Sequence, residues 1–127
     1  MKIWINLLNV RASISTINDS NTSVESLKSE VMRFVEARDW SKSHNPKDLS
    51  IAISIEIGEL LELFLFKNKS KVAEKLKNNP MYRERIAEEL ADVLIYSLEL
   101  AEYLKMDVSR IIRTKLEKNS IKYPLKK

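Results

Sequence analysis

Two pairs of acidic residues are the side chains best placed to do chemistry. One pair is Glu56 and Glu59, the other is Glu89 and Asp92, and two residues separate the members of each pair. Because an α-helix turns once in about 3.6 residues, this spacing puts both carboxylates of a pair on one side of a helix. Two such helices side by side would bring four carboxylates together, a set of oxygen ligands that suits Mg²⁺. The pattern predicts a divalent-metal site that could also hold phosphate oxygens.

The surroundings of the first pair favour this interpretation. Its helix contains no Lys or Arg between Asp48 and Phe66, and apolar residues flank Glu56. Ionised carboxylates in such surroundings are costly unless a cation or hydrogen-bond donors compensate them. The alternative to a metal site is that these acids form salt bridges across the bundle or face a subunit interface. A single acidic pair would favour that alternative, and two pairs favour the metal. A di-iron centre fits poorly, because it needs Glu-x-x-His motifs and the only histidine, His44, falls in a predicted connection.

Other acids lie near the two pairs in sequence. We assign them to the surface or to positions that support the site: Glu62, Glu88, Glu99 and Glu102. Glu88 competes with its neighbour Glu89 for the metal. We prefer Glu89, because only Glu89 is followed by an acid three residues later.

The elements that must position these acids are helices. Apolar residues repeat at helical spacing over about 22–39, 46–67, 81–105 and 107–119, with a short helix within 67–80, which predicts an all-α bundle of four to five helices. Thr22 and Glu25 form a capping box, Asn45 precedes Pro46 at a second start, and Asp107 caps the last helix. Pro124 should end that helix near Asn119.

Composition agrees with one helical domain. The chain has 127 residues, of which 44% are hydrophobic, and its one glycine and three prolines leave few residues for sheet turns. We expect a loose arm over 1–21 and the domain over 22–127. Without cysteine there is no disulfide framework or thiolate metal site. With no signal peptide or membrane-length apolar run, we expect a soluble, cytoplasmic protein that does not bind membranes.

The charge is distributed unevenly. Residues 105–127 contain eight basic and two acidic residues, a net of +6, so the overall +4 leaves −2 for residues 1–104. The basic end is either a solvated helix end that suits the helix dipole or a phosphate-facing segment. No dense basic stripe with interleaved aromatics is present, so we do not expect a nucleic-acid partner.

Five sequence blocks carry a family resemblance. They are Arg38-Asp39-Trp40, His44-Asn45-Pro46, Glu56-Ile57-Gly58-Glu59-Leu60, Glu89-Leu90-Ala91-Asp92-Val93-Leu94-Ile95-Tyr96, and Lys115 through Asn119 to Lys122-Tyr123-Pro124. Over about residues 26–127 the chain resembles the MazG-like all-α nucleotide pyrophosphohydrolases, and within them the dCTP pyrophosphatase group. The resemblance implies a homodimer or homotetramer that hydrolyses a nucleoside triphosphate to the monophosphate and diphosphate in nucleotide pool sanitation. The substrate would be dCTP or a modified pyrimidine deoxynucleotide.

The same resemblance implies roles for individual residues. Mg²⁺, or Mn²⁺ in its place, would be held by Glu56, Glu59, Glu89 and Asp92. Glu56 or Glu59 would orient or deprotonate the attacking water, and we favour Glu59. The substrate-binding positions would be Trp40, which stacks on the base, together with His44, Phe66, Lys115, Asn119 and Tyr123. Taken singly, such residues are more often a core tryptophan, a capping or turn histidine, a solvated lysine, a helix-ending asparagine and a packed tyrosine.

Two departures from the family pattern matter. Phe66 stands where the group commonly has a tryptophan, and 29 residues separate Glu59 from Glu89, at or beyond the upper end of the usual range. The connection over 67–80 should therefore differ from that of relatives. An alternative function is a non-catalytic helical module that binds a nucleotide or a protein partner on the same fold. The presence of all four acids argues against that alternative, and nucleic-acid binding by the basic end ranks third.

Overall fold

The computed structural model describes residues 14–127, and within them it contains only helices and their connections. Five α-helices and one 3₁₀ turn follow one another: α2 (Val24–Glu36), η1 (Trp40–Lys42), α3 (Pro46–Glu62), α4 (Lys69–Asn78), α5 (Pro80–Tyr103) and α6 (Val108–Lys122). The expected all-α fold class is confirmed. The first thirteen residues of the expected arm lie outside the described residues. Among residues 14–127, none of the helices combines the length and the apolar composition that a membrane span requires.

Polar side chains at the helix starts fix where the elements begin. Asn45 Oδ1 accepts a hydrogen bond from the Asp48 amide at 3.0 Å, and Asp107 Oδ1 accepts one from the Arg110 amide at 2.8 Å, as predicted. The predicted cap at Thr22 is wrong. Ser23 caps α2 instead, because its hydroxyl accepts from the Ser26 amide at 3.0 Å, while the Thr22 hydroxyl donates to the Asn21 side chain.

Three helices end elsewhere than predicted. Helix α2 stops at Glu36 rather than near 39, because Asp39 adopts a left-handed conformation with φ of 56°. Helix α3 stops at Glu62 rather than near 67, where the Leu63 carbonyl accepts a hydrogen bond from the Tyr82 hydroxyl at 2.8 Å and Phe66 has a φ of 60°. Helix α6 extends to Lys122, because Pro124 restricts only the residue directly before it.

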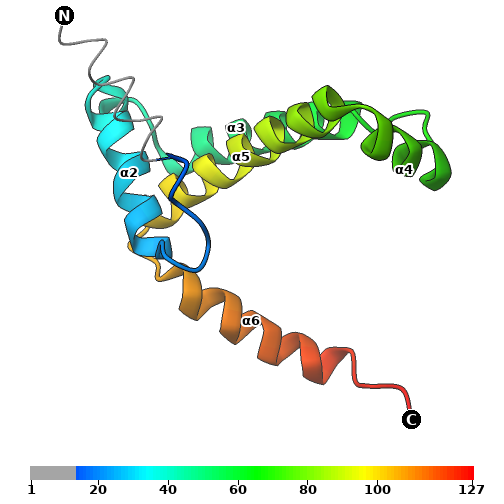
Figure 1. Cartoon of the computed structure of the whole chain (residues 1–127). Helices are drawn as coiled ribbons and strands as arrows, with labels where there is room; N and C mark the ends of the chain where they lie inside the picture. Colours follow the sequence, from blue (N-terminus) through cyan, green and yellow to red (C-terminus); the bar gives the residue numbers. More distant parts are fainter. Residues whose placement is uncertain (1–13) are drawn as a thin grey trace, which may run out of the picture.

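Helices α3 and α5 form the centre of the fold. They run side by side in opposite directions, while α2 packs against α5 near one end and α4 near the other (Figure 1). The buried apolar side chains within the described residues are few: Val35, Leu49, Leu63, Tyr82 and Ala101. Lys28 of α2 ties this arrangement together, because its Nζ lies 3.1 Å from Glu102 Oε2 on α5 and donates to the Met106 carbonyl at 3.0 Å.

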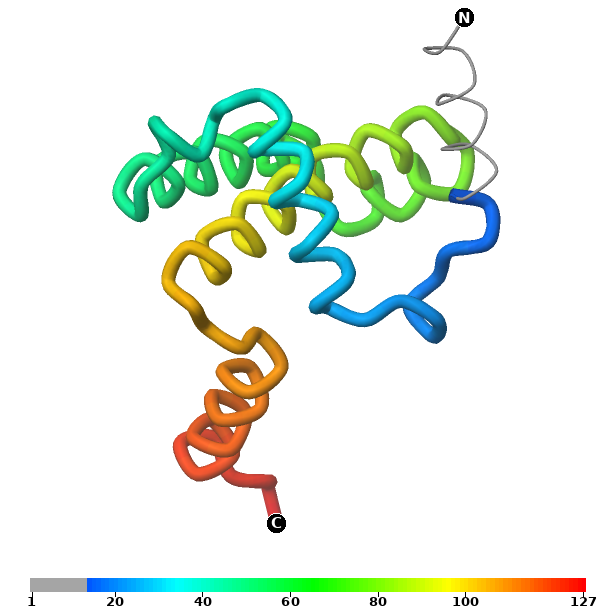
Figure 2. Tube along the Cα trace, turned by 90° about the vertical axis from the view of Figure 1, so that its left-hand side faces the viewer, coloured from blue at the N-terminus to red at the C-terminus, as the bar shows by residue number. Residues whose placement is uncertain are grey.

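Helix α6 leads away from the other helices, as both views show (Figures 1 and 2). Most of its apolar side chains stay exposed, namely Ile111, Ile112, Leu116 and Ile121, while Val108 is half-buried. Helix α3 also exposes apolar side chains, namely Ile51, Ile55, Ile57 and Leu61. Apolar surface of this extent on a small helical chain is typical of surfaces that are covered in an assembly.

Candidate active site

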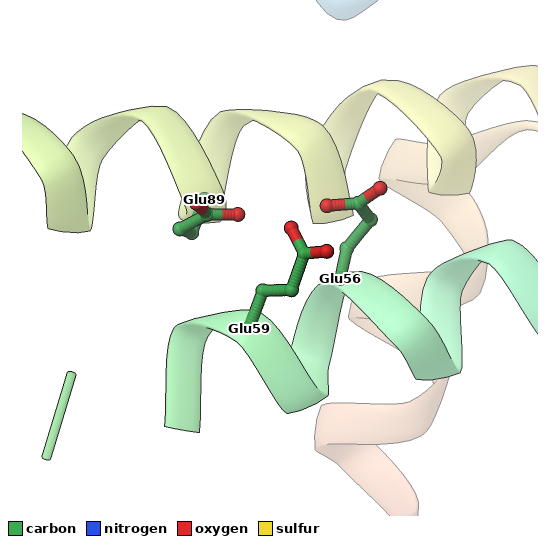
Figure 3. A group of neighbouring side chains, drawn as sticks. All are labelled: Glu56, Glu59 and Glu89. Carbon is green, nitrogen blue, oxygen red and sulfur yellow. The ribbon is translucent and has the colours of Figure 1, made fainter. Parts of the chain in front are cut away.

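Three of the four predicted metal ligands converge between α3 and α5. Glu56 and Glu59 extend from α3 toward Glu89 on α5, with Glu59 between the other two (Figure 3). One carboxylate oxygen from each residue can be chosen so that all three lie within 4.8 Å of one another. The i, i+3 spacing produces this arrangement, because it puts both glutamates of α3 on the side that packs against α5.

The fourth predicted ligand, Asp92, stands slightly apart from this group. It is exposed and lies about one turn further along α5 than Glu89. Asp92 is nevertheless close enough for its negative charge to raise the pKa of both Glu56 and Glu89. It therefore belongs to the same acidic site, at its edge rather than among the converging oxygens.

The three carboxylates lack compensation by protein groups. Glu89 Oε2 is buried without a hydrogen-bond partner in the structure. Loss of solvent raises the pKa of Glu89, and Glu59 beside it raises that pKa further. The pKa of Glu56 is raised for the same reasons, first by loss of solvent and then by Glu59, Asp92 and Glu89. Burial and repulsion between neighbouring carboxylates thus disfavour the charged forms of Glu56 and Glu89.

Salt bridges do not resolve that repulsion within the described residues. The ion pairs of residues 14–127 involve other acids, and none includes Glu56, Glu59, Glu89 or Asp92. A buried acceptor without a donor is a group that a cation can satisfy. The oxygen-only donor set suits a hard divalent cation, so the residues present fit the metal that the sequence predicts.

An apolar pocket lies directly beside the acidic site. It has a volume of about 630 Å³, is lined by residues of α2, of η1 and of α5, and includes Asp92 in its wall. Trp40 also lines the pocket, is 43% exposed, and meets the Phe34 ring edge to face at 5.8 Å between centroids. Tyr96 lines it too, and its pKa is raised by burial and then by Glu56, Asp92 and Glu99. The pocket thus adjoins the acids.

A buried carboxylate in this pocket excludes one of the two positions that the sequence left open for it. Glu99, assigned to the surface or to a supporting position, is only 3% exposed and lines the pocket wall. His44 Nδ1 is hydrogen-bonded to Glu99 Oε1, so the connection after η1 is tied to α5. The signal was present in the sequence, since Glu99 follows Asp92 by seven residues and two helical turns place both residues on one face.

The other predicted substrate-binding residues lie apart from the acids within one chain. Phe66 is fully exposed beyond the end of α3. Lys115 and Asn119 belong to α6 and Tyr123 follows it, and this helix leads away from the α3 and α5 pair (Figure 1). Lys115 instead lies beside the exposed apolar residues Ile111, Ile112 and Leu116. Within a single chain, the structure therefore places only Trp40 at the pocket beside the acids, with His44 bonded to Glu99 in the pocket wall.

The fold and site define a class: an all-α protein in which two packed helices present facing carboxylates beside an apolar pocket. Residues 51–127 match the model of the MazG-like family. The chain belongs to the MazG-like family.

Individual relatives extend this comparison. The chain is 34% identical over 103 residues to dCTP pyrophosphatase 1 of Rattus norvegicus, covering 81% of this chain and 60% of that protein. It is 33% identical over 102 residues to dCTP pyrophosphatase 1 of Homo sapiens, covering 80% and 59% respectively. The chain thus matches about three fifths of the length of these relatives. A crystal structure of a pyrophosphatase from Archaeoglobus fulgidus superposes with a TM-score of 0.75 and 35% identity, covering 87% of this chain and 100% of that one.

Proposed function

We propose that this protein is a metal-dependent nucleoside triphosphate pyrophosphohydrolase. The observation that carries the proposal is the junction at Asp92, where a carboxylate cluster meets an apolar pocket that contains an accessible tryptophan. A nucleotide has the same two parts, a polyphosphate that needs a cation and a flat base that can stack on an aromatic ring. Relatives that bear the name dCTP pyrophosphatase and a structural neighbour described as a pyrophosphatase support the assignment.

The proposed metal ligands are Glu56, Glu59 and Glu89, with Asp92 at the edge of the site. Bound Mg²⁺, or Mn²⁺ in its place, would neutralise phosphate charge and make a coordinated water more acidic. Glu89 offers a buried oxygen that no protein group satisfies, which is why we place it among the ligands.

Glu59 is the proposed general base, with Glu56 as the alternative. It lies between the other two glutamates in Figure 3 and is exposed, so water can reach it. Its carboxylate can place an oxygen within 4.8 Å of both neighbours, and its negative charge raises the pKa of both. In the proposed reaction Glu59 takes the proton of the attacking water, the water oxygen bonds to the α-phosphorus, and the bond from that phosphorus to the bridging oxygen breaks. Diphosphate leaves with that oxygen, and the nucleoside monophosphate remains.

The proposed substrate is dCTP or a modified pyrimidine deoxynucleotide, and removing it would serve nucleotide pool sanitation. Trp40 would stack on the base, because its ring lines the pocket while nearly half of its surface remains accessible. The names of the curated relatives supply the choice of dCTP.

We further propose that the protein works as a homodimer or homotetramer. Helix α6 carries Lys115, Asn119 and an exposed apolar face away from the rest of its own chain. Packing of that face against a second copy would remove apolar surface from water and could bring Lys115, Asn119 and Tyr123 to the neighbour's site. This arrangement would reconcile their predicted role with their position in one chain.

Turnover assays test the proposed activity. The full chain should release diphosphate from at least one nucleoside triphosphate with Mg²⁺, and release should stop when a chelator is added. Glu59→Gln should lower kcat by about 100-fold or more, the usual contribution of a general base. Glu62→Gln removes a charge from the same helix outside the cluster and should keep activity. Nucleotide binding without turnover would favour the non-catalytic module instead.

A further inference from the structure

We propose that Glu99 is a specificity-determining residue that accepts a hydrogen bond from the exocyclic amino group of a base, and that His44 is the positioning residue that holds it. The inference rests on the proposed function in one respect, that the pocket beside the acids receives the base. It does not depend on whether the bound nucleotide is hydrolysed.

The position of Glu99 is unusual for a carboxylate. It is 3% exposed, yet it forms part of the wall of a cavity of about 630 Å³ whose lining is mostly apolar. Charged side chains are rarely buried unless another group pairs with them or binds them. Its burial therefore requires partners that can donate hydrogen bonds.

His44 supplies one such partner. His44 Nδ1 is hydrogen-bonded to Glu99 Oε1, and when this carboxylate is ionised it can only accept, so His44 then carries a hydrogen on Nδ1 and donates it. Across residues 14–127 this is the only hydrogen bond to the Glu99 side chain. A carboxylate can accept about four hydrogen bonds, so Oε2 retains its full capacity. A donor on a ligand in the cavity can use that capacity.

Distance along α5 indicates which part of a nucleotide would reach Glu99. Asp92 and Glu99 both line the pocket and lie on one face of the helix, about 10 Å apart at the usual rise per residue. A nucleotide with its phosphates at the acids and its base over Trp40 would present the far edge of the base to Glu99. The only other acid in the pocket wall, Glu30, is exposed on α2.

The chemistry of a carboxylate then discriminates between bases. The amino group at position 4 of cytosine donates hydrogen bonds, whereas uracil and thymine have a carbonyl oxygen at that position. A carbonyl oxygen facing Oε2 would put two acceptors together and leave both without a donor. Mispairing a buried polar group costs about 1–3 kcal/mol, equivalent to roughly 5-fold to 150-fold in affinity.

His44 contributes by fixing the direction of the carboxylate. Its ring lies 5.9 Å from the Trp40 ring between centroids, so it adjoins the proposed stacking residue as well as Glu99. If the pair had only a structural role, tying the segment after η1 to α5, it would affect folding without affecting the choice of base. Base preference is therefore the property to measure.

Binding of the products dCMP and dUMP by isothermal titration calorimetry tests the inference without relying on turnover. The full-length wild type should bind dCMP about tenfold or more tightly than dUMP, in the range expected for one mispaired buried group. Glu99→Gln should reduce that ratio to within about threefold, because an amide can turn either its acceptor or its donor toward the base. His44→Ala keeps the carboxylate but releases it, so the ratio should fall by a smaller factor.

Glu84→Gln is the matched control, because it neutralises an exposed carboxylate on the same helix that is outside the pocket and in none of the ion pairs of residues 14–127. It should keep the wild-type ratio, and circular dichroism should show all variants folded. The inference is overturned if wild type binds neither product, binds both equally, or keeps its preference in Glu99→Gln. Preference for dCMP without any diphosphate release would refute the proposed activity and leave the role of Glu99 intact.

Discussion

Neutralising one member of the acidic cluster should have opposite effects on stability without metal and with metal. In the metal-free protein, the ionised form of Glu56 lowers the free energy of unfolding, because the side chain is partly buried and is repelled by Glu59 and Glu89. The same two causes raise its pKa. Glu56→Gln preserves the shape of the side chain and removes its charge. The variant should therefore be more stable than wild type in chelator at pH 7 and respond less to added Mg²⁺.

The magnitude follows from the separation of the oxygens. At 4.8 Å, the upper limit for the distances among the three chosen oxygens, two unit charges repel by about 0.9 kcal/mol in water and about 3.5 kcal/mol at an effective dielectric constant of about 20. Glu56 is only partly buried and solvent screens it, so a value near the lower limit applies. Removing its repulsion with Glu59 should raise the free energy of unfolding by about 1 kcal/mol, or Tm by about 4 °C.

Thermal unfolding in chelator and in Mg²⁺ measures both effects. Free metal at about 100 times Kd stabilises a protein by about 2.7 kcal/mol, and a site tenfold weaker gains only about 1.4 kcal/mol. Glu62→Gln provides the control, because it should leave the metal-induced shift in Tm unchanged. A metal-free Glu56→Gln protein less stable than wild type, or one with the full metal response, would refute the assignment of Glu56 as a repelled metal ligand.

Three further predictions concern pH, the base and assembly. The pKa values of Glu56 and Glu89 in the folded state lie above the ordinary value of 4.5, so the folded state binds more protons at these groups than the unfolded state does. Their contribution to the free energy of unfolding in chelator should therefore fall as pH rises from about 4.5 through the folded-state pKa values. Urea titrations of wild type and Glu56→Gln should diverge in that pH range. Trp40→Ala should raise KM while leaving the Mg²⁺ dependence unchanged, and an unaltered KM would exclude stacking. Leu116→Lys should dissociate the assembly, as judged by light scattering, whereas a wild-type monomer would contradict the proposed oligomer.

Local sequence rules predicted those features of the structure that a single helix determines by itself. The pairs at Glu56 and Glu89 could be placed on facing helices because their i, i+3 spacing fixes the side on which they lie. The start of α3 at Pro46 was predicted because Asn45 satisfies a free amide within its own first turn. Both predictions depend on interactions within a few residues of each other.

Other features could not be predicted because a distant partner decides them. The end of α3 depends on a hydrogen bond from Tyr82, 19 residues away, which helix periodicity cannot reveal. Glu99 is buried and hydrogen-bonded to His44, 55 residues earlier, so the sequence left open whether Glu99 lies on the surface or supports the site. The direction of α6 depends on packing that neither local propensity nor motif spacing specifies.

The hydrogen bond between Tyr82 and Leu63 has a consequence for how this protein can vary. It joins the end of α3 directly to the first turn of α5, and Tyr82 is buried there against the Phe64 ring. This hydrogen bond therefore helps to fix the alignment of α3 with α5 that sets Glu56 and Glu59 opposite Glu89, and it does so without the segment 64–81 that connects the two residues. Helix α4 and its flanking loops lie between the two bonded residues, so they can lengthen or shorten without breaking this bond. The long connection between the two acid pairs therefore need not disturb the alignment of the carboxylates.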